Sequence, residues 1–226
     1  LVIWFGGERV IIRPLEQLHD TARRLSLGDY KARTGLAETS GEIGDVARAF
    51  DEMATTLASK SEVLRLNRAL QLLLAMNREL VKSTHEEGLM KATCRLAVES
   101  GGYRMAMIAF AEHDLARRVR PVAWAGMDEG YLSNANIVWS DEPHGRGPTG
   151  TAIREGRPVV NQRFDSNPAL APWRDEALRR GYQASAALPL MEGQQVMGAL
   201  TFYATEPEAF SEEEMKLLGQ LAEDLA

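Results

Sequence analysis

The residue types that most often carry catalysis are few in this chain of 226 residues, and they lie far apart. A single cysteine, Cys94, cannot form an internal disulfide or a zinc site built from several thiolates. The histidines show no metal-site spacing and stand at positions 19, 85, 113 and 144. The sequence also has no phosphate-binding loop, nucleophile elbow or paired-histidine zinc motif. We therefore predict no catalytic residues and no metal site, and expect that the chain is not an enzyme.

Composition narrows the class of protein and its partners. Apolar residues make up 45% of the chain and charged residues 26%, which is enough for packed cores and too apolar for extensive disorder. The formal net charge of −6 argues against a large surface for binding phosphate groups. We therefore expect a folded protein with no nucleic-acid partner.

The beginning of the chain, Leu1 to Phe5, is apolar and is followed by Arg9 and Arg13. A bilayer span takes about 20 apolar residues, so this stretch alone cannot cross a membrane. It fits the cytoplasmic end of a transmembrane segment flanked by positive charge, which we place at residues 1–8. An apolar leader on a soluble chain is the alternative.

Apolar residues then repeat with steps of three and four, the pattern of a coiled coil. The first such stretch follows Pro14 and ends before Gly28, and a second begins at Ile43. No glycine or proline lies between Asp45 and Thr84, so one long helix is expected there. The phase of the repeat slips near residues 58–63.

Apolar seams of this length favour a partner helix from a second copy, so we predict a parallel homodimer. The alternative is an amphipathic helix that packs on its own domain. The predicted interface residues are Leu15, Leu18, Leu25, Ile43, Val46, Phe50, Met53, Leu57, Leu66, Leu70 and Leu73.

The same region resembles a HAMP domain over residues 9–60. Pro14 precedes the first seam, Gly28-Asp29-Tyr30 opens the connector, and Glu42-Ile43-Gly44 starts the second helix. The resemblance implies a parallel four-helix bundle made by two chains, placed between a membrane span and an output module. Residues 61–83 would then form a coiled-coil linker helix.

The rest of the chain, residues 84–226, resembles a GAF domain. The predicted domain opens with a helix capped by Thr84, followed by a hairpin of strands 103–110 and 119–125. A crossover then carries helix 149–155, strand 158–160 and helix 175–180. A second hairpin, of strands 182–191 and 196–204, leads to a last helix capped by Ser211. The motifs that carry the resemblance are Gly147-Pro148-Thr149-Gly150, Gly156-Arg157-Pro158-Val159 and Ala187-Leu188-Pro189-Leu190. The predicted fold is therefore multidomain, α and α+β, with a helical bundle, a long helix and an antiparallel sheet flanked by helices.

GAF relatives hold small molecules between the sheet and the crossover. Here the crossover carries Trp139, Phe164 and Trp173, and Tyr182 enters the next strand. Such aromatics suit a mostly apolar pocket, and we predict them as ligand contacts. The alternative is that they fill the core. The sequence identifies no cofactor. A GAF-fold methionine sulfoxide reductase needs more cysteines than Cys94, so that enzyme is not expected.

Together the two resemblances imply a sensory and relay fragment of a membrane-anchored bacterial receptor, on the cytoplasmic face of the inner membrane. The HAMP helices would transmit a signal from the membrane, and the GAF domain would bind a small molecule that modulates an output domain outside this fragment. Two-component or cyclic-di-GMP signalling is the expected context. The alternative is a ligand-free GAF module for dimerisation and scaffolding.

The first prediction concerns the dimer. Replacing Phe50 or Leu57 by Asp should convert dimers to monomers, because the new charge would be buried in the seam without a partner. Sedimentation velocity of the parent and substituted proteins measures this directly. Equal dimer fractions in both would contradict the predicted interface.

Overall fold

The computed structural model describes residues 11–82 and 85–226, which form two compact units. The first unit ends at Leu64 and the second begins at Arg65. The predicted end of a transmembrane segment, residues 1–8, lies outside the described residues. Within the described ranges, no helix has both the length and the apolar character that a membrane crossing requires.

The first unit consists of helix α2 (Arg13–Ser26), a connector and the beginning of helix α3 (Glu42–Lys82). Pro14 occupies the first turn of α2, where its missing N–H costs no helical hydrogen bond. Leu25 of α2 and Ala54 of α3 form a small core with Ala32 of the connector. Thr34 ties the connector to α3, because its N–H and hydroxyl donate to the Asp51 carboxylate at 2.8 and 3.0 Å. Leu15, Val46 and Met53 remain exposed on the single chain.

Helix α3 is continuous from Glu42 to Lys82, which confirms the single long helix. From Arg65 onward it belongs to the second unit. Leu72 and Met76 are fully buried in the core of that unit, whereas Leu70 and Leu74 on the other side of the helix are exposed. The segment predicted as a free coiled-coil linker therefore has one face packed on its own domain, and Leu73 lies partly buried at the edge of that contact.

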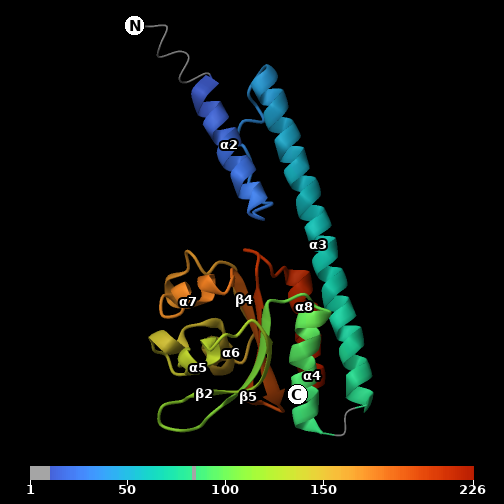
Figure 1. Ribbon diagram of the computed structural model, residues 1–226, viewed down its shortest axis with the longest axis vertical. Coiled ribbons are helices and arrows are strands. Elements are labelled where there is room, and N and C mark those ends of the chain that lie inside the picture. Colours follow the sequence, from blue (N-terminus) through green and yellow to red (C-terminus); the bar gives the residue numbers. More distant parts are fainter. Residues whose placement is uncertain (1–10, 83–84) are drawn as a thin grey trace. The chain divides into compact units, whose positions relative to one another are not determined.

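The second unit is built on an antiparallel five-stranded sheet with the strand order β2-β1-β5-β4-β3. The strands are β1 (Met105–Ala111), β2 (Val119–Gly126), β3 (Val159–Asn161), β4 (Ala184–Glu192) and β5 (Gln195–Ala204). The helices are α4 (Glu86–Glu99), α5 (Tyr131–Asn134), α6 (Pro148–Glu155), α7 (Arg174–Arg179) and α8 (Glu212–Leu225), with short 3-10 turns at Pro143–Gly145 and Pro168–Leu170. One face of the sheet is covered by α3, α4 and α8, and the other by the crossover with α5, α6 and α7 (Figure 1).

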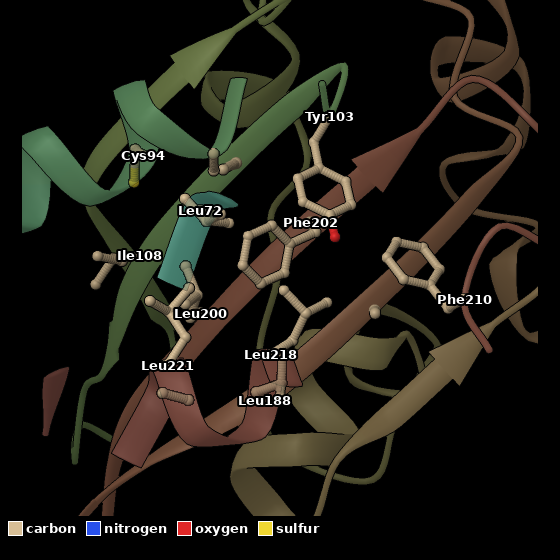
Figure 2. Close-up of a cluster of buried hydrophobic side chains, with 14 of the residues drawn as sticks. Leu72, Cys94, Tyr103, Ile108, Leu188, Leu200, Phe202, Phe210, Leu218 and Leu221 are labelled. Carbon is tan, nitrogen blue, oxygen red and sulfur yellow. The ribbon is translucent and has the colours of Figure 1, made fainter. Parts of the chain in front are cut away.

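The helix-covered face holds the larger core. Leu200 and Phe202 of β5, Leu188 of β4 and Ile108 of β1 point toward Leu72 and the last helix (Figure 2). Cys94 of α4 is fully buried in the same cluster, and burial raises the pKa of its thiol to about 12. The thiol is therefore neutral at physiological pH and behaves as a small apolar side chain, as the sequence predicts.

Most predicted elements are present, with three differences. Strand β1 begins at Met105 and β4 at Ala184, so Tyr103 and Tyr182 precede the strands in which they were predicted. The short helix α5 was not predicted. Ser211 caps α8 through a bond from the Glu214 N–H at 3.2 Å, as predicted, whereas Thr84 lies outside the described residues and α4 begins after His85.

The packing of α3 predicts a contrast between two leucines of the same helix. Leu72→Ala should lower the free energy of unfolding of the GAF-like unit by about 2–5 kcal/mol, because it opens a cavity in the core. Leu74→Ala, the matched control at a position 53% exposed, should change it by less than about 0.5 kcal/mol. Urea unfolding of the 226-residue chain, followed by tryptophan fluorescence, measures both values. Equal small effects would show that this segment is a linker outside the domain.

Candidate functional site

The crossover face of the sheet encloses a cavity of about 20 Å³, which is room for about one water molecule. The floor is formed by β4 and β5, and the walls come from α5, the start of α6 and the segment between β3 and α7. The lining residues are Tyr131, Ile137, Gly147, Pro148, Thr149, Phe164, Leu170, Trp173, Ser185, Thr201 and Tyr203.

Strand alternation places hydroxyl groups on the cavity floor. Residues two apart share a face of a strand, so Thr201 and Tyr203 point to the cavity while Leu200 and Phe202 enter the opposite core. The hydroxyls of Thr149 and Thr201 lie 3.0 Å apart, and the Tyr203 hydroxyl lies close to those of Thr149 and Tyr131. A connected set of hydroxyls therefore runs along one side of the cavity.

Two polar atoms beside this set have no partner. The Oγ of Ser185, a residue only 1% exposed, has no hydrogen-bond partner among the described residues. Its cross-strand neighbour Asn161 is 3% exposed, and the Nδ2 of its amide is also buried without a partner within the described part of the chain. Cross-strand neighbours share a face of the sheet, so the two atoms belong to one region. Buried polar groups normally have a hydrogen-bond partner, so both atoms are candidates for hydrogen bonds to a bound molecule.

The aromatic wall closes against the backbone of α6. The Trp173 ring packs closely on Gly147. A Cβ atom added to Gly147 would lie 2.8 Å from this ring, and glycine avoids that clash because it has no Cβ. The indole N–H of Trp173 donates to the Ala135 carbonyl at 2.6 Å and holds the ring in that position. A ligand larger than water would need this wall to move outward.

The tyrosines of the cavity stay neutral. Burial raises the pKa of both Tyr131 and Tyr203 above the ordinary value. The Arg180 guanidinium lies over the Tyr131 ring, 5.6 Å from its centroid, but is occupied by backbone carbonyls of Asp128 and Glu129 and by Glu176. The tyrosine hydroxyls can therefore donate and accept hydrogen bonds but bring no charge to the site.

Two of the predicted ligand contacts line the cavity, and two do not. Phe164 and Trp173 form part of the wall. Tyr182 is fully buried next to it and packs against Tyr203 with ring centroids 4.7 Å apart. Trp139 lies in a different cluster, where its indole N–H donates to the Glu112 carbonyl and the Arg117 guanidinium covers its ring.

Sequence reasoning missed the polar part of the site. The residues concerned lie in strands and belong to no recognisable sequence motif: Ser185, Thr201 and Tyr203. The signal that was available is the isolated polar residue Ser185 in the apolar run of β4, and the alternation of Thr201 and Tyr203 with apolar residues in β5.

Charged groups are absent from the lining residues that the structure describes. Three arginines of the crossover that could pair with an anionic group are engaged elsewhere: Arg146 with Asp141, Arg163 with Asp165, and Arg154 with carbonyls that include Gly145. Within residues 11–82 and 85–226, no group of acidic, histidine or cysteine side chains is arranged to hold a metal ion. The lining of the cavity, as far as the structure describes it, is therefore uncharged.

These features define a domain with a closed pocket between a sheet and its crossover, preceded along the chain by a helical module. A model of the GAF domain matches residues 83–226, and a model of the HAMP domain matches residues 8–59. The chain therefore belongs to the GAF domain family and carries a HAMP domain ahead of its GAF domain, as predicted. No curated protein matches the chain in sequence.

Solved structures show the same fold. The GAF domain of a phosphoenolpyruvate-protein phosphotransferase from Coxiella burnetii is 19% identical, with a TM-score of 0.58 over 71% of this chain and 91% of that one. Free methionine-R-sulfoxide reductase from Neisseria meningitidis, solved with its substrate, is 18% identical, with a TM-score of 0.57 over 70% of this chain and 85% of that one. The GAF domain of NLH2 from A. aeolicus, solved in an inactive state, is 20% identical, with a TM-score of 0.53 over 70% and 93%.

Ser185 allows a test of whether the unpaired hydroxyl is structural. Ser185→Ala should raise the free energy of unfolding by up to about 1 kcal/mol, because it removes a buried hydroxyl without a partner. Thr201→Val, the control, should lower it by about 1 kcal/mol, because the hydroxyl of Thr201 is paired with Thr149. Chemical denaturation measures both. A loss of stability in Ser185→Ala equal to that in Thr201→Val would assign Ser185 a structural bond.

Proposed function

We infer that this chain is a sensory module of signal transduction, because it combines a HAMP domain with a GAF domain. We propose that the GAF domain of this chain senses a small uncharged molecule in the cavity floored by β4 and β5. The observation that carries the proposal is a pair of buried polar atoms without a hydrogen-bond partner among the described residues: the Oγ of Ser185, which lines the cavity, and the Nδ2 of Asn161 on the neighbouring strand. A core without a ligand site would be more stable if these two groups were apolar, because each unpaired buried polar group lowers the free energy of unfolding.

The chemistry of the site limits the ligand. The Asn161 amide is a donor and the Ser185 hydroxyl both donates and accepts, so together they suit a carbonyl or hydroxyl oxygen. Phe164 and Trp173 suit a compact apolar body. An anionic phosphate is disfavoured, because no lining side chain is charged. Cyclic nucleotides therefore fit the site poorly.

Binding requires the cavity to open. The existing volume holds about one water molecule, and Trp173 closes the wall against Gly147. The described state is thus the closed one, and a ligand would be taken up by displacing the aromatic wall. The energy of that displacement is the means by which occupancy can alter the rest of the domain.

For the HAMP domain we propose the relay role, in a parallel dimer anchored at the membrane. One chain supplies only α2 and the first part of α3, and it leaves Leu15, Val46 and Met53 exposed. Two chains together would bury this apolar surface, which the single chain cannot do. The cytoplasmic face of a bacterial inner membrane is the location that this arrangement favours.

A catalytic role receives less support. The reductase from Neisseria meningitidis shares the fold, but similarity at 18% identity does not transfer an activity. Cys94 is the only cysteine of this chain, and it lies in the core on the sheet face opposite the cavity, with its pKa raised to about 12. We therefore propose that any catalytic output belongs to another domain. A ligand-free GAF scaffold remains the second candidate, because the wall aromatics are almost fully buried in the closed state.

A thermal-shift screen with small uncharged metabolites tests the sensing role. A true ligand at 100 times its Kd should stabilise the protein by about 2.7 kcal/mol. Ser185→Ala should weaken a confirmed hit about tenfold, because one hydrogen bond to the ligand is lost.

Trp139→Phe is the control for this screen, because Trp139 lies outside the cavity lining and should leave affinity unchanged. Hits that bind Ser185→Ala and the parent equally would place binding elsewhere. The absence of any hit across a broad panel would favour the scaffold.

A further inference from the structure

The end of β5 leads directly from the cavity to a loop that reaches α3. Tyr203 lines the cavity and Ala204 ends the strand, and residues 205–211 then connect β5 to α8. We call residues 205–211 the β5–α8 loop. It connects the end of the cavity floor to α8, on the side of the sheet covered by helices.

One side of this loop is bonded to the cavity wall. The N–H of Glu208 donates to the Gln162 carbonyl at 2.9 Å, and the Gln162 amide donates to the Phe210 carbonyl at 2.6 Å. Gln162 stands two residues before Phe164, a wall residue of the cavity. A displacement of this wall would therefore also move the β5–α8 loop.

The other side of the loop is bonded to α3. Arg65 donates from Nη1 to the Glu208 carbonyl at 3.0 Å and pairs through Nη2 with the Glu206 carboxylate at 3.3 Å. The Arg65 side chain is only 14% exposed, whereas the Glu206 side chain is 43% exposed, so the bond to the Glu208 carbonyl is the better shielded of the two contacts. Glu208 is therefore held by its N–H toward the cavity wall and by its carbonyl toward α3.

The backbone of Glu208 is unusual as well. Its φ of +53° lies in the left-handed region, which costs energy for a residue with a Cβ. The hydrogen bonds from Arg65 and to Gln162 hold the peptide groups on either side of this residue. A loop held in such a conformation by two sets of contacts can change state when one set is disturbed.

We propose that Arg65 is a positioning residue that couples the cavity to α3 through the β5–α8 loop. The inference rests on the proposed sensing function, because ligand uptake is what would move the wall. Displacement of Phe164 or of the end of β5 shifts Gln162 and Glu208, and Arg65 passes the shift to the first turn that α3 contributes to this unit. Coupling of this kind is reciprocal, so a movement of α3 also changes the ease of opening the cavity.

A double-mutant cycle read by hydrogen–deuterium exchange tests the coupling without a ligand. Gly147→Ala perturbs the cavity, because the added Cβ forces Trp173 outward. In the parent background it should change exchange of the α3 amides at 66–76 several-fold. In the Arg65→Gln background the same perturbation should leave those amides unchanged, while the amides of β4 still respond in both.

Arg68→Gln is the matched control. Arg68 lies one turn further along α3, is exposed and makes no hydrogen bond or ion pair that the structure records among the described residues. It should preserve the response. Thr201→Val is the second cavity variant, used if Gly147→Ala does not fold.

An α3 response that persists in Arg65→Gln, or is missing in the parent while β4 responds, would overturn the proposal. A cavity variant that changes neither β4 nor α3 would overturn it too, because the wall would then not move the floor. A metabolite screen without hits would instead remove the sensing function and leave the measured coupling standing.

Discussion

The alternation of side chains along β4 and β5 is the constraint on which the GAF domain depends. Because successive residues of a strand point to opposite faces, the same ten-residue strand β5 supplies Leu200 and Phe202 to the helix-covered core and Thr201 and Tyr203 to the cavity. A shift of one residue in register would exchange the two sets. The apolar core on one face thus fixes the register that presents the hydroxyls on the other.

Helix α3 experiences two environments along its length. In the HAMP domain it packs against α2 and the connector through Ala54 and Phe50, and from Arg65 it packs on the GAF core through Leu72 and Met76. The boundary between the two units, at Leu64 and Arg65, falls directly after the slip in heptad phase at residues 58–63. The slip therefore coincides with the place where the helix changes its packing partner.

Under the proposed sensing function, a ligand must open a cavity that has room for about one water molecule. The apparent affinity for the ligand is then reduced by the fraction of molecules in which the cavity is open. The unpaired polar atoms of Ser185 and Asn161 lower the stability of the closed state and so reduce this cost. In the proposed function, this loss of stability in the ligand-free domain makes it easier for a ligand to open the cavity.

The sequence alone determined the order and type of the elements, because the periods of 3.5 and 2 in apolar residues reflect local backbone geometry. It also determined the two domains and the burial of Cys94. Only the tertiary structure decided which residues meet in the cavity. Ser185, Asn161 and Thr201 stand on different strands, and their proximity depends on strand order and register. Trp139 and Trp173 belong to the same crossover but to different clusters, because the path of that crossover is set by packing between distant segments.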